Sequence, residues 1–119
     1  MNFFDLISSS LPPDDIFVVD LYEQINDYED IIKREEKLLK VEKFRLDALD
    51  FQEYATNLDQ RRKNVHNIIV SDVMHILENL RRNGIAIPKE LDFGIADDRS
   101  SILSRILSDF HSYNKGGKK

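Results

Sequence analysis

The chain contains no cysteine, which excludes disulfide bonds, thiol nucleophiles and any metal site built on thiolates. It also lacks an apolar run of the roughly 20 residues that a membrane-spanning helix needs. The opening segment, Met1–Ser10, has apolar residues but neither a basic region before them nor a clear cleavage site, so we do not expect a secretory signal. These absences favour a cytoplasmic protein with no membrane partner.

Glycine and proline are missing from the whole stretch 14–83. Only side chains can turn the backbone there at low cost, so the stretch predicts long helices with few interruptions. The chain has 119 residues, of which 41% are hydrophobic and 33% charged. That composition predicts a single helical domain, residues 1–119, with one modest core.

Basic charge is scarce in the first half of a chain whose net charge is −5. Residues 14–50 hold twelve acids and six bases. This balance argues against nucleic-acid binding, which needs a basic stripe. It favours a basic protein surface as partner, and the chain itself carries one in Arg61, Arg62, Lys63, Arg81 and Arg82.

Two series of apolar residues recur at alternating spacings of three and four, the pattern of a helical seam of the coiled-coil type. The first is Val18, Leu21, Ile25, Tyr28, Ile32 and Leu39, and the second is Phe51, Ala55, Leu58, Val65, Ile69, Ile76 and Leu80. We therefore predict an all-α helical bundle built on a long antiparallel hairpin, with helices over about 14–46 and 51–82.

Cap signals place the ends of the second helix. Asp50 followed by Glu53 resembles a capping box, and Gly84 suits a left-handed cap after the last turn. We expect the chain to turn near Ala48, so that the numbers of facing residues sum to 97. Glu35 then faces Arg62, which predicts a structural ion pair that fixes the register more than it adds stability.

The same register makes further predictions. Leu39 should face Leu58, and Ile32 should face Val65. Asp72 falls opposite the apolar Ile25, so we expect it to lie beside the seam, with Val73 in the buried place.

A third helix is predicted over about 99–113, capped by Asp97 or Asp98. Its apolar residues follow a 3.6-residue period, and they are Ile102, Leu103, Ile106, Leu107, Phe110 and Tyr113. Residues 1–12 are expected to form an arm or short helix, and residues 114–119 a disordered tail. Because the third helix is much shorter than the hairpin, a second copy of the chain would cover the rest, giving a homodimer.

An arginine followed five residues later by a histidine stands in the second helix, at Arg61 and His66. This six-residue pattern resembles the motif of the HEPN ribonucleases, small helical bundles that dimerise around a metal-independent RNA-cleaving cleft. The resemblance implies that Arg61 positions the scissile phosphate and that His66 acts as acid or base. Arg105 and His111 satisfy the permitted spacing as well, and the competing interpretation is a solvated Arg61 beside an Arg62 paired with Glu35.

Asp72 and His75 lie three residues apart on one helical face, with Glu78 one turn further. Such a spacing can bind a metal, but the ferritin-like pattern needs Glu-x-x-His on two helices, and the sequence has none. We expect a charged surface face, and neither a metal nor a cofactor.

These observations favour a small non-enzymatic protein that binds another protein or a second copy of itself. An adaptor, a regulator or an immunity- or antitoxin-like accessory protein would fit its size and class. The alternative is the HEPN-like ribonuclease dimer that uses Arg61 and His66.

Overall fold

The computed structural model describes residues 1–41, 44–94 and 97–117, with side chains up to Asn114. The described chain contains helices and no strands, which confirms the predicted all-α class. The elements are α1 (Phe3–Ser10), α2 (Ile16–Lys40), α3 (Ala48–Arg82), a short 3-10 helix η2 (Lys89–Leu91) and α4 (Arg99–Gly117). The molecule measures 56 × 36 × 24 Å.

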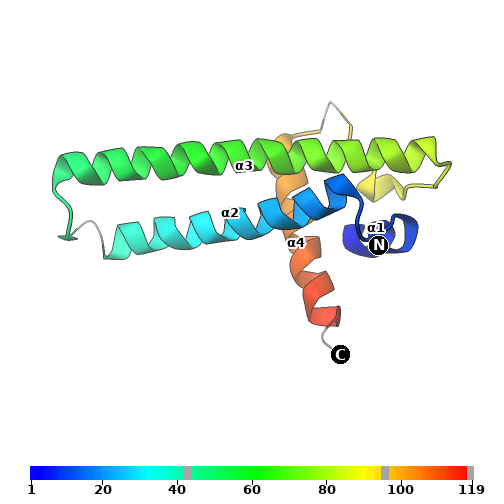
Figure 1. Cartoon of the computed structure of the whole chain (residues 1–119), viewed down its shortest axis with the longest axis horizontal. Helices are drawn as coiled ribbons and strands as arrows, with labels where there is room; N and C mark the ends of the chain where they lie inside the picture. Colours follow the sequence, from blue (N-terminus) through cyan, green and yellow to red (C-terminus); the bar gives the residue numbers. More distant parts are fainter. Residues whose placement is uncertain (42–43, 95–96, 118–119) are drawn as a thin grey trace.

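Helices α2 and α3 run antiparallel, side by side, and form the predicted long hairpin (Figure 1). Asp15 caps α2, because its side chain accepts hydrogen bonds from the backbone N–H groups of Phe17 and Val18. Helix α2 ends at Lys40, six residues before the predicted end. The connection between the two helices is therefore longer than the tight turn that the sequence indicated.

The predicted cap of α3 is wrong. The helix begins at Ala48, and Asp47 is its N-cap, with Asp47 Oδ1 accepting a hydrogen bond of 2.9 Å from Asp50 N. Asp50 lies inside the first turn, where its carboxylate favours the positive end of the helix dipole, and Glu53 lies one turn further on. Asp47, three residues before Asp50, can also accept a hydrogen bond from the first turn of the helix. The capping-box pattern did not show which of these two aspartates is the cap.

Gly84 ends α3 as predicted, with a positive φ of 72°. Ile85 N donates to Leu80 O at 3.0 Å and Gly84 N donates to Arg81 O at 3.0 Å. These two bonds form a Schellman motif, which satisfies carbonyls that the helix end would otherwise leave free.

The register holds in the middle of the hairpin and shifts by one residue along α2. Leu58 and Val65 are buried as predicted, but Ile31 and Leu38 are the buried residues of α2, and Leu39 is 61% exposed. Ile32 instead lines a groove beside α4. Leu39 lies on that same side of α2, two turns beyond the reach of α4, so solvent covers it.

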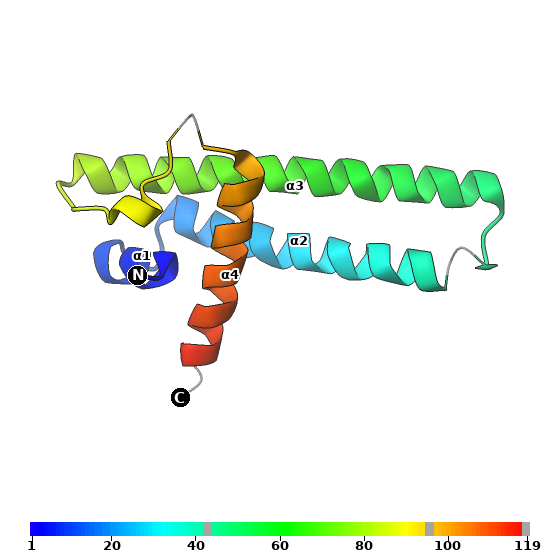
Figure 2. The same cartoon turned by 180° about the vertical axis from the view of Figure 1, so that it is seen from behind.

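The core lies at the open end of the hairpin, where α1 and α4 pack (Figures 1 and 2). Helix α1 folds onto its own chain, and its four buried side chains are Phe3, Phe4, Leu6 and Ile7. The Phe4 ring centroid lies 5.3 Å from that of Phe110 on α4 and 5.6 Å from that of Tyr22 on α2. The predicted arm is thus a short helix that joins α2 and α4.

Helix α4 crosses the hairpin, begins at Arg99 as predicted and extends beyond the predicted end (Figure 2). Asp98 caps it, accepting from Ser101 N at 3.2 Å, whereas Asp97 accepts from Gly94 N in the connection before the helix. The helix continues to Gly117, four residues beyond the predicted end. Residues 118–119 lie outside the described chain.

Candidate functional site

Large apolar side chains are exposed around the closed end of the hairpin. We define the distal surface by these residues, which are Leu39, Val41, Phe44, Leu49 and Tyr54. Leu49 is 79% exposed and Phe44 is 77% exposed. Beside them Leu46, Asp50, Glu53, Tyr54 and Asn57 line a shallow hollow of about 280 Å³. The distal surface is therefore apolar, with acidic residues at its edge.

The distal surface exists because α4 crosses near the middle of the hairpin and α1 packs at its open end, so neither covers the closed end (Figure 1). Leu38 and Leu58 are the last buried residues toward the closed end, each 3% exposed. Among the described residues between these two positions, none is buried. Sequence reasoning anticipated this shortage of cover from the length of the third helix.

Arg62 links the two long helices at the edge of the covered region. Its Nε lies 3.3 Å from Glu35 Oε1, and both side chains are 30% exposed. Arg62 also donates to Asp59 Oδ1, and Lys63 Nζ lies 3.1 Å from Asp59 Oδ2. The predicted Glu35–Arg62 pair is present, but Asp59, three residues before Arg62, is the carboxylate that hydrogen-bonds it.

These contacts shift the titration of the charged groups. The hydrogen bond that Arg62 donates to Asp59, followed by the charge of Glu35, raises the pKa of Arg62. Hydrogen bonds from Arg62 and Lys63 lower the pKa of Asp59. The Asp59–Arg62 spacing of three is a standard helical ion-pair signal that sequence reasoning missed.

A carboxyl pair joins α2 and α3 nearer the open end. Asp72 is only 6% exposed, so it is buried together with Val73 and does not lie clear of the seam. Burial, together with hydrogen bonding to and the charge of the neighbouring Asp20 carboxyl, raises the pKa of Asp72 to about 8. Asp72 Oδ2 has no hydrogen-bond partner in the part of the chain described. Asp72 thus keeps its proton near neutral pH, where an ordinary aspartate is ionised.

The structure does not bring Arg61 and His66 together within one copy. A separation of five residues turns them about 140° apart around an α-helix. His66 Nε2 lies 3.4 Å from the backbone O of Arg99, at the start of α4, and Arg61 is exposed. In the second match to the pattern, Arg105 pairs with Asp109, while His111 Nε2 lies 3.5 Å from Glu29 Oε1.

The Asp72, His75 and Glu78 side chains do not meet at one site either. The His75 ring stacks on Phe17 with centroids 4.6 Å apart, and its Nδ1 lies 2.8 Å from Ser71 O. Glu78 forms ion pairs with Arg81 and Arg82 at the end of α3. Over residues 1–41, 44–94 and 97–117 there is no group of three or more His, Asp or Glu side chains that could hold a metal ion.

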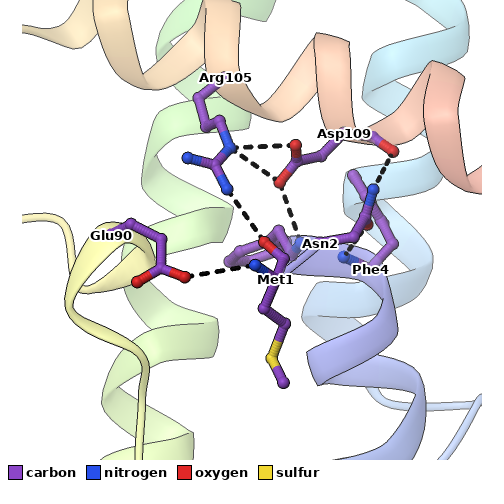
Figure 3. Close-up of polar contacts among 7 residues, drawn as sticks. Met1, Asn2, Phe4, Glu90, Arg105 and Asp109 are labelled. Atoms are coloured by element: carbon purple, nitrogen blue, oxygen red, sulfur yellow. Dashed lines mark hydrogen bonds and ion pairs between the residues drawn. The ribbon is translucent and has the colours of Figure 1, made fainter.

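Hydrogen bonds and an ion pair among Asn2, Phe3, Arg105 and Asp109, which we call the latch, hold α1 against α4 (Figure 3). Asp109, which is buried, accepts from Phe3 N at 2.9 Å and from Arg105 Nε at 3.0 Å. Asn2 Nδ2 donates to Asp109 O at 2.7 Å, while Asn2 Oδ1 accepts from Phe4 N and caps α1. The latch positions α1 and carries no reactive group, so its role is structural.

Comparison with protein-family models, with curated proteins and with solved structures found no match to this chain. In the described chain, none of the helices combines the length and the apolar character needed to cross a membrane.

Proposed function

We propose that this protein acts without catalysis, as a cytoplasmic adaptor or regulator that binds another protein through the distal surface. One observation carries the proposal: large apolar side chains are exposed at the closed end of the hairpin, where Leu39, Leu49 and Tyr54 are 61%, 79% and 39% exposed. Exposed apolar surface on soluble proteins is typical of interaction sites.

The composition of the distal surface supports the same proposal. Aromatic and large aliphatic anchors surrounded by charged residues are the usual make-up of a protein–protein interface. Here Leu49 and Tyr54 stand beside the exposed charges of Lys40, Asp50 and Glu53. A rigid helical hairpin presents these groups at its end without having to be ordered on binding, which lowers the entropic cost of association.

The test uses site-specific photo-cross-linking. A photoreactive side chain replaces Leu49 in one variant and Ile16 in another, because Ile16 is 75% exposed at the opposite end of the hairpin. We expect a discrete cross-linked protein product from position 49 and none from position 16. Adding Leu39→Asp to the position 49 variant should abolish the product while circular dichroism stays unchanged. Equal labelling from both positions would refute the proposal.

A further inference from the structure

We infer that the partner at the distal surface is a second copy of this chain. Two hairpins lie side by side with their closed ends level, and the end of α2 in each copy lies against the start of α3 in the other. The inference rests on the proposed function, since it names the partner of that same surface.

The two sides of the closed end carry opposite charge. Of the described residues in 33–45, which include the end of α2, five are basic and two are acidic. Residues 47–60, which begin α3, hold four acidic residues and no basic one. A surface that is basic on one side and acidic on the other is complementary to a rotated copy of itself, which a two-fold dimer requires.

Much of this charge is not used within the chain. Near the closed end, the described hairpin contains the ion pairs Asp30–Arg34 and those that Arg62 and Lys63 form with Glu35 and Asp59. Four exposed charges near the closed end take no part in these pairs, and they are Lys37, Lys40, Asp50 and Glu53. Both signs are therefore available to a second molecule.

The charge pattern also selects the geometry of the dimer. A two-fold axis parallel to the hairpin sets α2 of one copy beside α3 of the other, antiparallel, so each basic helix end meets an acidic helix start. An axis perpendicular to the hairpin and passing through the two closed ends would set the basic end of α2 beside the same end of its copy and bring like charges together, which is unfavourable. The first arrangement places Leu39, Leu49 and Tyr54 of both copies around one four-helix contact.

The experiment uses two charge-reversed variants of the full chain. The acidic variant carries Lys37→Glu and Lys40→Glu, and the basic variant carries Asp50→Lys and Glu53→Lys. We measure mass against concentration by sedimentation equilibrium for wild type, for each variant, and for an equimolar mixture of the two. We expect a wild-type dimer, dimerisation weakened about tenfold or more in each variant alone, and a heterodimer in the mixture at least as tight as wild type.

The equimolar mixture is the decisive measurement. If the four reversed charges served only to hold the hairpin of their own chain together, mixing the two variants would not restore dimerisation. The matched control reverses two exposed acids four residues apart on the proximal part of α2, Glu23→Lys with Asp27→Lys. This control should dimerise like wild type, and circular dichroism should show that all four proteins remain helical.

A monomeric wild type, or a mixture that stays as weak as its components, would overturn the inference. A monomer whose position 49 still cross-links another protein would leave the proposed function standing, with a different partner. A dimer that persists unchanged in the Leu39→Asp, Leu49→Asp variant would remove the distal surface from self-association, and so refute the inference by a separate route.

Discussion

Replacing the buried Asp72 by asparagine is expected to stabilise the protein at pH 8 and to leave its stability at pH 4 almost unchanged. Asp72 is 6% exposed and lies against the carboxyl of Asp20. An asparagine has nearly the same shape as the protonated aspartate, and its Nδ2 can donate to Asp20 at every pH. The substitution therefore removes the titration while keeping the packing.

The sign follows from the raised pKa. In the folded protein Asp72 titrates at about 8, against 3.8 for an ordinary aspartate. Between these values the unfolded chain has lost a proton that the folded chain keeps, so the free energy of unfolding falls as pH rises. The slope approaches 1.36 kcal/mol per pH unit, and four units set an upper bound of about 5 kcal/mol. Because the amide must itself be buried, we expect Asp72→Asn to gain about 1–3 kcal/mol at pH 8.

The assay is urea unfolding followed by circular dichroism from pH 4 to pH 9. Asp59→Asn is the contrasting variant on the same helix, because the pKa of Asp59 is lowered. Its contribution to stability is present above the ordinary aspartate pKa and is lost as pH falls, so Asp59→Asn should destabilise at neutral pH and converge with wild type in acid. A wild-type stability that stays flat or rises between pH 5 and pH 8, or an Asp72→Asn variant less stable than wild type at pH 8, would refute the reasoning.

Three further substitutions test the latch, the ion pair and the ribonuclease alternative. Asp109→Ala should cost about 2–4 kcal/mol in urea unfolding, because it strands a buried backbone N–H of α1 and a guanidinium; Asp30→Ala, whose exposed pair lies within one helix, should cost less than about 0.5 kcal/mol. Glu35→Ala should cost about 0.5–1 kcal/mol, since Arg62 keeps a second carboxylate; a loss above about 2 kcal/mol would show that Glu35 alone satisfies it. His66→Ala should leave folding unchanged, and any RNA cleavage by the protein that this variant abolishes would revive the HEPN-like interpretation.

The features that the sequence predicted depend on local chemistry. The backbone at the end of α3 takes a left-handed conformation, which glycine adopts at low cost. The role of Gly84 could therefore be predicted without knowing which residues surround it. The Glu35–Arg62 pair was predicted because the apolar series of the two long helices are interrupted at the same level of the hairpin, one by an acid and the other by a base. Both interruptions are visible in the sequence. Helix type and hairpin topology came from periodicity over many residues, so errors at single positions did not matter.

The features that the sequence did not predict depend on packing between distant elements. Leu38 and Leu39 both suit the seam by spacing, and the way α2 is turned against α3 decides which of them is buried. Asp20 and Asp72 meet only because the hairpin is offset near its open end, where Phe17 also stacks on His75. The apolar pattern marks an aspartate only as a polar residue, so it cannot show that the side chain is buried or that its pKa is shifted.

The latch between α1 and α4 has a consequence for the order in which the chain folds. Phe3 N and Asp109 Oδ2 are separated by 106 positions in sequence, so α1 leaves the ribosome long before the helix that receives it. Contacts between such distant segments form late, since loop closure must precede them. Until α4 is made, α1 can pack only on the α2–α3 hairpin, through contacts such as Phe4 with Tyr22, and the side that Phe110 later covers faces water or any chaperone that binds apolar segments.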